Sequence, residues 1–313
     1  MKYVAKKLLT LIITLFIVSL LAFLAFQIIP GDVTTDLLGT NATPQQIAEL
    51  QAKLGLNQPA LLRYSRWLGS FVRGDMGTSY NYNLPVREMI AQKLPITLVL
   101  TLMAFAMTVL LSFPLGILAA RKEGGVFDRI LTVFNQICMS VPPIFVGILL
   151  CFLFGITLKV FVPGNFVSYQ ESWGKFLLYM IFPAFSIALS RIAMTVKMLR
   201  SSVLKEMGQD YIRTAYSRGH GRLAAMRNHA VRNAIIPVIA FLAVTMAEMV
   251  ASCIVIEQVF TVPGIGRLLL ASISNRDFPV AQAIVVILAF WVVFVNFIAD
   301  VLYQYMDPRI RLG

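Results

Sequence analysis

The chain has 313 residues, of which 58% are hydrophobic and 13% are charged, and its mean hydropathy is +0.78. This composition excludes a soluble globular domain and indicates an integral membrane protein. The formal net charge of +12 suits either nucleic acid or the anionic inner surface of a membrane, so the positions of the basic residues must decide between these partners.

Six segments are long and apolar enough to cross a lipid bilayer. A hydrocarbon core about 30 Å thick requires about 20 mainly apolar residues in a helix. The predicted spans are 8–29, 95–120, 131–157, 174–196, 235–256 and 280–303. The first follows a basic start, as a signal peptide does, but its apolar run exceeds the length of about 7–15 residues typical of that class. We therefore predict an all-α membrane protein with six transmembrane helices.

The distribution of basic residues predicts the orientation of these spans. Lys and Arg are enriched in the short cytoplasmic loops of membrane proteins. If the N-terminus is cytoplasmic, 17 of the 27 basic residues lie inside, and nine of these fall between Arg191 and Arg232. We therefore predict that both termini are cytoplasmic and that the charge serves the lipid surface or a protein partner, with no nucleic acid.

The predicted outer loop, residues 30–93, carries signals of ordered helices. Thr43 is placed as an N-cap, with Pro44 at the first helical position and Gln46 able to close a capping box. Gly55 follows just past the end of this helix. A second helix would carry its apolar residues on one face: Leu61, Tyr64, Leu68 and Phe71. We predict an extracytoplasmic helical cap, the alternative being a plain loop folded onto its own spans.

The sequence contains few residues that could perform catalysis. It has no G-x-x-x-x-G-K-[ST] phosphate loop, no G-x-S-x-G elbow and no paired carboxylates within a predicted span. His220 and His229 lie nine residues apart without a nearby cysteine, which fits no zinc motif. The three cysteines, Cys138, Cys151 and Cys253, lie in apolar segments and are interpreted as packing residues. We expect no catalytic residue, no metal site and no cofactor in this chain.

One acidic residue, Glu248, lies far from either end of its predicted span. Eleven residues of helix after Pro237 place it about 17 Å into the membrane, where a carboxylate costs several kcal/mol unless it meets water, a partner or a substrate. Our hypothesis is that Glu248 lines a translocation path. The alternative is a protonated or hydrogen-bonded residue at a helix interface.

The segment from Asp210 to Pro237 contains five arginines, two histidines and one acidic residue. It predicts two short helices separated by Gly219, with Pro237 in the first turn of the fifth span. The arginines can pair with carboxylates or with phospholipid head groups. The simpler alternative is a positively charged loop. A DNA-binding helix-turn-helix is disfavoured because apolar residues alternate with arginine in the second helix.

Several short sequence blocks along the chain can be compared with those of known protein families. The loop reads "DYIRTAYSRG" followed by "HAVRNAIIP". The other blocks are "IIPGD" at 28–32, "LGLNQP" at 54–59, "GDMGTSY" at 74–80, "VFTVPGIGRLL" at 259–269, "RDFPVAQ" at 276–282 and "DPRIR" at 307–311. In this order they resemble the membrane subunits of bacterial ABC importers for dipeptides, oligopeptides and nickel complexes. The resemblance covers nearly the whole chain.

The resemblance implies a type I ABC importer transmembrane domain located in the bacterial inner membrane. Its parts would be the N-terminus and first span (1–29), the cap loop (30–93) and a five-helix core (94–313) with a cytoplasmic coupling loop (197–236). Such a chain forms half of the translocation path for di- or oligopeptides. It works with a second homologous permease subunit, two ATP-binding cassette subunits that bind and hydrolyse ATP, and an extracytoplasmic solute-binding protein.

The resemblance also implies which residues couple the chain to the ATPase. They are Asp210, Arg213, Ala215, Gly219, His229, Arg232, Asn233 and Pro237. Two alternatives remain open for the function. The same architecture could import a nickel or other metal chelate or glutathione, and Glu248 could instead serve an ion-coupled secondary transporter.

Overall fold

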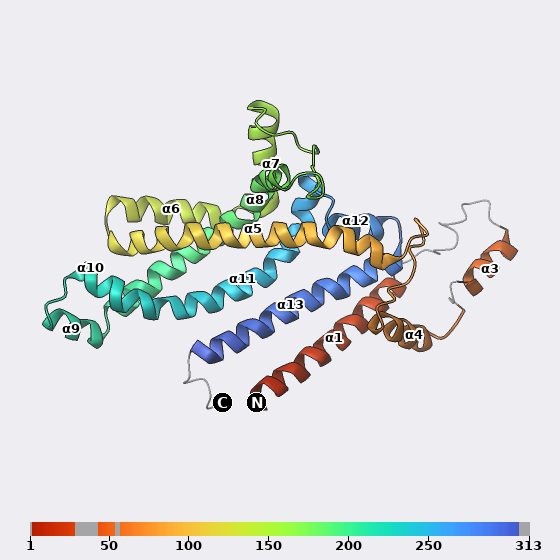
Figure 1. Ribbon diagram of the computed structural model, residues 1–313, viewed down its shortest axis with the longest axis horizontal. Coiled ribbons are helices and arrows are strands. Elements are labelled where there is room, and N and C mark those ends of the chain that lie inside the picture. The colour runs from red at the N-terminus through yellow and green to blue at the C-terminus, as the bar shows by residue number, and fades with distance from the viewer. Residues whose placement is uncertain (1, 29–42, 54–56, 307–313) are drawn as a thin grey trace. The chain divides into compact units, whose positions relative to one another are not determined.

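The computed structural model describes residues 2–28, 43–53 and 57–306 (Figure 1). Within these ranges the chain is helical, and its β-structure is limited to one isolated bridge between Thr78 and Pro85. The helices are α1 (Lys2–Ile28), α3 (Pro44–Lys53), α4 (Ala60–Val72), α5 (Val86–Arg121), α6 (Val126–Ser140), α7 (Pro143–Leu150), α8 (Trp173–Met207), α9 (Asp210–Ser217), α10 (Arg222–Ala225), α11 (Val231–Val259), α12 (Ile265–Ser274) and α13 (Phe278–Met306). Two π-helical segments, η1 (Cys151–Thr157) and η2 (Met226–Ala230), adjoin them.

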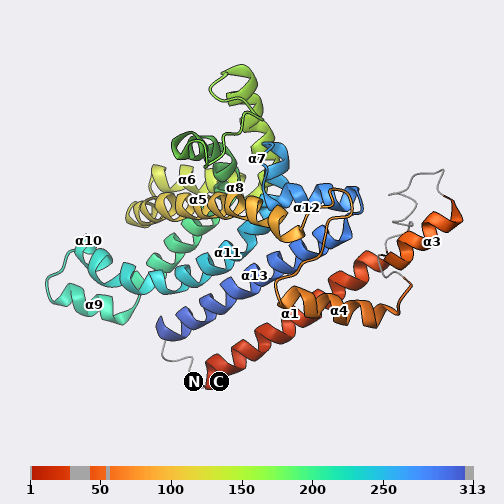
Figure 2. The ribbon, with the colours of Figure 1, turned by 45° about the vertical axis from the view of Figure 1, so that its right-hand side comes forward.

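The predicted transmembrane fold is confirmed, with one change to its third span. Five helical segments in the described part of the chain are long and apolar enough to cross a membrane. A sixth span results only if α6 and the α7–η1 helix are counted together, and these two are bent by 99° (Figures 1 and 2). The prediction of one helix over 131–157 was therefore wrong.

Consecutive prolines cause this bend. Val141 and Pro142 have extended backbone conformations, and Pro143 begins α7. Proline lacks a backbone N–H and disfavours a helical conformation in the residue before it. The sequence Val141–Pro142–Pro143 therefore ends α6 and allows α7 to start in a new direction.

The chain divides into two compact units. Unit 1 comprises Met1–Ile96 with Pro263–Val293, and unit 2 comprises Thr97–Val262 with Phe294–Gly313. The division into a first span (1–29), a cap loop (30–93) and a five-helix core (94–313) remains a prediction.

In unit 1, the two predicted helices of the outer loop are present. The Gln46 backbone N–H donates to Thr43 Oγ1 at 3.3 Å, and the Thr43 N–H donates to Gln46 Oε1 at 3.0 Å, so the capping box of α3 is confirmed. Gly55 lies outside the described residues. In α4, Tyr64 is buried, and its hydroxyl lies 2.8 Å from Ser19 Oγ of α1. Tyr64 therefore packs α4 against α1, whereas Leu61 of the predicted apolar face is exposed.

A buried carboxylate organises the loops of unit 1. Asp277, just before α13, accepts hydrogen bonds from the Ser79 hydroxyl and from the Tyr80 backbone N–H, the latter at 3.0 Å. Asn81 Nδ2 donates to the Asn275 carbonyl oxygen at 3.0 Å. Burial, and then the nearby Asp277 carboxylate, raise the pKa of the Tyr80 hydroxyl. The short turn at residues 78–85 is thus held against the start of α13.

In unit 2, α8 is the central helix and packs against α6, α7 and α11. Small buried residues line α8 and allow close approach of its neighbours: Ala184, Ser186, Ala188, Ser190 and Ala193. Near the end of α11, Glu257 is fully buried and accepts a hydrogen bond from the Thr97 hydroxyl of α5. Glu257 lies one residue beyond the predicted fifth span, 235–256, and its burial was not predicted.

The expectation that Pro237 lies in the first turn of a span was wrong. Residues Arg222–Val259 form one continuous helical segment, which includes α10, η2 and α11, and Pro237 is inside it. Met226, Ala234 and Val238 from this segment are buried together with Leu199 and Val203 of α8. Because burial of this apolar side begins well before Pro237, the helix begins earlier than hydropathy indicated.

We expect Asp277→Ala to destabilise the protein, because it leaves the buried Ser79 hydroxyl and the Tyr80 N–H without their acceptor. The free energy of unfolding should fall by about 2–4 kcal/mol, measured as a lower midpoint of thermal unfolding in detergent. Asp75→Ala is the matched control, because the exposed Asp75 accepts only the Gly77 N–H in the same loop. It should cost less than about 1 kcal/mol, and equal losses in the two variants would contradict this assignment.

Candidate functional site: a helical knob and an intramembrane ion pair

The loop between α8 and α11 folds into a compact knob, defined here as residues 208–230. It lies at one end of α8 and α11 in both ribbon views (Figures 1 and 2). Ile212 and Ala215 of α9 are buried against Ala225 and Ala230. The predicted pair of short helices is present, with α10 continuing through η2 into α11. This small core gives the loop a defined shape, which a plain positively charged loop would not require.

Gly219 determines the turn between the two helices of the knob. Its φ is +84°, in the left-handed region that favours glycine. The Gly219 N–H donates to the Tyr216 carbonyl at 2.9 Å, and the His220 N–H donates to the Ala215 carbonyl at 3.2 Å. These bonds satisfy the last carbonyls of α9, as a glycine C-cap does. Among the described residues, no atom lies within 4 Å of where a Gly219 side chain would begin.

The predicted coupling residues share one surface only in part. Five of them are exposed: Asp210, Arg213, Gly219, Arg232 and Asn233. His229 and Pro237 are half-buried, and the ring of His229 lies 5.6 Å from that of His220 in an edge-to-face arrangement. Ala215 is buried inside the knob. The Ala215 side chain is therefore not available to a partner at the surface, because its methyl group fills the core of the knob.

Tyr211 of α9 links the knob to its neighbours. Its hydroxyl donates to Glu206 Oε2 of α8 at 2.5 Å. Burial, and then this hydrogen bond, raise the pKa of the Tyr211 hydroxyl, while a hydrogen bond with Asn233 of α11 acts in the opposite direction. Tyr211 thus contacts the ends of both helices that carry the knob.

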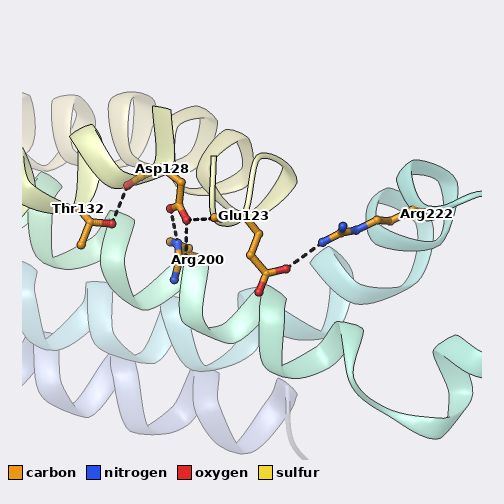
Figure 3. Close-up of polar contacts among 6 residues, drawn as sticks. Glu123, Asp128, Thr132, Arg200 and Arg222 are labelled. Atoms are coloured by element: carbon orange, nitrogen blue, oxygen red, sulfur yellow. Dashed lines mark hydrogen bonds and ion pairs between the residues drawn. The ribbon is translucent and has the colours of Figure 1, made fainter. Parts of the chain in front are cut away.

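Ion pairs connect the knob to the turn between α5 and α6 (Figure 3). Arg222 Nη2 lies 2.9 Å from Glu123 Oε2 at the surface. A second pair lies nearby: Arg200 of α8 donates to Asp128 through Nε at 2.5 Å and through Nη2 at 2.7 Å. Asp128 also accepts the Gly124 N–H at 2.9 Å. The Arg222–Glu123 pair therefore connects the turn at 122–125 to the knob. The Arg200–Asp128 pair connects the start of α6, just after this turn, to α8.

Sequence reasoning missed this connected pair of salt bridges. Arg200 and Asp128 are 72 residues apart, and Arg222 and Glu123 are 99 residues apart. A local motif does not report pairing over such distances. The available signal was the position of Asp128, an acidic residue in the first turn of α6, which helix electrostatics alone would explain.

Glu248 is paired within the membrane-spanning region. Its Oε2 lies 2.6 Å from Arg191 Nη1 of α8. The Arg191 side chain is 19% exposed, whereas that of Glu248 is 52% exposed. Arg191 lies in the interior of α8, which continues for sixteen residues beyond it to Met207. The pair keeps Arg191 within the span and leaves the Glu248 carboxylate open to contact.

The described residues contain no group of three or more His, Cys, Asp or Glu side chains that could hold a metal ion. Charged contacts between elements of unit 2 include the Arg222–Glu123 pair at the knob, the Arg200–Asp128 pair between α8 and α6, and the Arg191–Glu248 pair. The chain is thus a multi-span helical protein with a structured loop at one end of α8 and α11.

Comparison with known proteins identifies the family. Residues 112–312 match the model of the binding-protein-dependent transport system inner membrane component, and residues 1–101 match the model of its N-terminal part. The chain belongs to this family and is a multi-pass protein of the bacterial inner membrane.

Relatives align over nearly the full length of the chain. A probable peptide ABC transporter permease protein of Sinorhizobium fredii is 32% identical over 99% of both chains. A putative peptide transport system permease protein of Brucella abortus is 35% identical over 98% of both. An oligopeptide transport system permease protein of Bacillus subtilis is 33% identical over 99% of both. Family membership does not favour the alternative of an ion-coupled secondary transporter.

We expect Arg200→Ala to be strongly destabilising, because it leaves the buried Asp128 carboxylate without its counter-charge. The free energy of unfolding should fall by about 3–5 kcal/mol, measured by denaturant unfolding in detergent. Arg222→Ala removes the exposed pair with Glu123 and should cost no more than about 1 kcal/mol. If Arg222→Ala proved the more costly of the two, the anchoring role of Arg200 would be refuted.

Proposed function

We propose that the chain is one permease subunit of an ATP-driven importer of peptides. The observation that carries this proposal is the full-length similarity to relatives whose names refer to peptide or oligopeptide transport. A nickel or other metal chelate or glutathione is the alternative cargo, suggested only by the wider family that the sequence resembles.

The subunit itself is non-catalytic in this proposal. Its sequence has no phosphate loop, so ATP is bound and hydrolysed by two separate ATP-binding cassette subunits. A second homologous permease completes the translocation path. An extracytoplasmic solute-binding protein delivers the peptide, which fits the family description of a binding-protein-dependent system.

The knob is the proposed docking site for one ATPase subunit, within a coupling segment from Asp210 to Pro237. Asp210, Arg213, Arg232 and Asn233 are exposed and offer charged or polar groups to a partner. The remaining predicted positions act through shape: Ala215 fills the knob core, Gly219 forms its turn, His229 lies in η2, and Pro237 lies in α11.

The contacts behind the knob provide a route by which its movement could reach the spans. The Arg222–Glu123 pair connects the knob to the α5–α6 turn, and Tyr211 connects it to Glu206 of α8. Both contacts resist a displacement of the knob. The Arg200–Asp128 pair then holds that turn to α8. ATP-driven motion of the docked subunit would therefore move α5, α6, α8 and α11 as a connected group.

Glu248 is proposed to line the translocation path. About half of its side chain is exposed although it lies in a membrane-spanning helix, and a charge exposed to hydrocarbon at that depth would cost several kcal/mol. A water-filled path avoids this cost, which supports the hypothesis over a purely lipid-facing position.

We expect Gly219→Trp to uncouple transport from ATP hydrolysis. A tryptophan must adopt a left-handed backbone conformation there, and its ring would cover the docking surface. Peptide uptake should fall at least about tenfold, since loss of 1.4 kcal/mol of docking free energy has this effect. Co-purification with the ATPase subunit should decrease in parallel.

Gly174→Trp, near the start of α8, is the matched control, because a side chain at that position also meets no described atom within 4 Å. It should retain uptake and association with the ATPase. Normal uptake and normal association in Gly219→Trp would contradict the docking proposal.

The cargo is tested with the complete transport complex reconstituted in liposomes, including the solute-binding protein. We expect ATP-dependent uptake of labelled di- and tripeptides that unlabelled peptides inhibit in competition. Omission of ATP is the control for leakage. Uptake of a nickel chelate or glutathione, with no uptake of peptides, would replace the proposed cargo by its alternative.

A further inference from the structure

The Arg191–Glu248 pair has features that a purely structural salt bridge does not need. A carboxylate beside a guanidinium is best satisfied by two parallel hydrogen bonds, as Arg200 and Asp128 form in the same unit. Arg191 donates only through Nη1 to Glu248. Its Nε is buried and has no hydrogen-bond partner among the described residues. The guanidinium therefore retains donor capacity that Glu248 does not use.

The surrounding residues do not supply the missing acceptor. Thr195, one turn along α8, donates its hydroxyl to the Arg191 carbonyl at 2.7 Å. Thr245, on α11 near Glu248, donates its hydroxyl to the Phe241 carbonyl at 2.9 Å. Each hydroxyl oxygen keeps lone pairs that can accept a hydrogen bond, but neither accepts from Arg191 Nε, which has no partner among the described residues. The Arg191 guanidinium and the Glu248 carboxylate therefore each keep hydrogen-bonding capacity that their mutual contact does not use.

The depth and exposure of the pair suit a position in the proposed translocation path. Glu248 lies eleven residues before the end of α11, or about 17 Å along the helix, and about half of its side chain is exposed. Arg191 lies behind it with 19% exposure. An approaching molecule would meet the carboxylate first and the guanidinium next to it. Because the two charges cancel, the site presents no net charge to a peptide in the path.

We propose that Arg191 and Glu248 together form a charge-balanced contact for peptides in the translocation path, with Arg191 as a further specificity-determining residue. Arg191 meets carboxylates of the passing peptide, and Glu248 meets its ammonium groups. The pair exchanges its internal salt bridge for these contacts and re-forms afterwards. Peptides of either net charge can therefore pass. This inference rests on the proposed function, in which Glu248 lines the path of a peptide importer.

Single neutralising substitutions should create opposite charge preferences. Arg191→Gln leaves the Glu248 carboxylate unbalanced, so the path should favour cationic peptides over anionic ones. Glu248→Gln leaves the Arg191 guanidinium unbalanced, so the preference should reverse. Two unit charges about 4 Å apart interact by several kcal/mol at the effective dielectric near a protein surface. A change of at least about tenfold in the preference is therefore expected.

The test uses the full complex in liposomes and three probes: trialanine and its analogues with a central lysine or a central glutamate. The uptake of each probe by a variant is divided by its uptake by the wild-type complex, which cancels the preferences of the solute-binding protein. The charge preference is the normalised uptake of the lysine probe divided by that of the glutamate probe. It should rise in Arg191→Gln and fall in Glu248→Gln. Two exposed residues of unit 2 provide the matched controls, Arg129→Gln and Glu171→Gln, which should leave the ratio unchanged.

A different pattern would overturn the inference. If both variants reduced the uptake of all three probes equally, the pair would be a structural salt bridge or part of a subunit interface. If neither variant changed any rate, it would have no role in transport. Both results leave the proposed peptide import intact, because the wild-type complex still transports peptides, but they remove the proposed path role of Glu248. If the wild-type complex transported none of the three probes, the proposed function would fail, and the inference with it.

Discussion

Charge neutralisation along α8 is the constraint on which the helical packing of unit 2 depends. An unpaired charge in an apolar environment is costly, so each arginine in this helix must bring a counter-charge from a neighbouring helix. Arg191 takes Glu248 from α11, and Arg200 takes Asp128 from α6. These two pairs fix which faces of α6 and α11 are turned toward α8. The small buried residues of α8 then allow the close approach that the short ion pairs require.

The two pairs differ in a way that corresponds to their proposed roles. Arg200 binds Asp128 through both of its arms, and the carboxylate is almost fully buried. This geometry suits a permanent anchor between helices. Arg191 uses a single donor, and half of the Glu248 side chain is accessible. This geometry suits a contact that opens and closes, so one helix carries both a fixed connection near the knob and an exchangeable one deeper in the span.

Much of the fold was predictable because the signals that produce it are local. The apolar runs predicted the spans, and the Thr43–Gln46 capping box predicted the start of α3. Gly219 predicted the turn of the knob because only glycine adopts its backbone conformation without strain. The errors arose where packing overrides local preference. The helix leading into α11 begins before Pro237 because its apolar side is already buried against α8.

The sequence by itself determined the number of apolar segments, the ordered loop with its glycine turn and the presence of one carboxylate deep in a span. Each of these depends on residues within a few positions of one another. Only the tertiary structure decided which charges meet. The partners Arg191 and Glu248 are 57 residues apart, and Asp128 and Arg200 are 72 residues apart. Ala215 turned inward for the same reason, because its environment is made by Ala225 and Ala230 of the following helix. Helix formation depends on neighbours along the chain, whereas neutralisation and burial depend on which helices pack together.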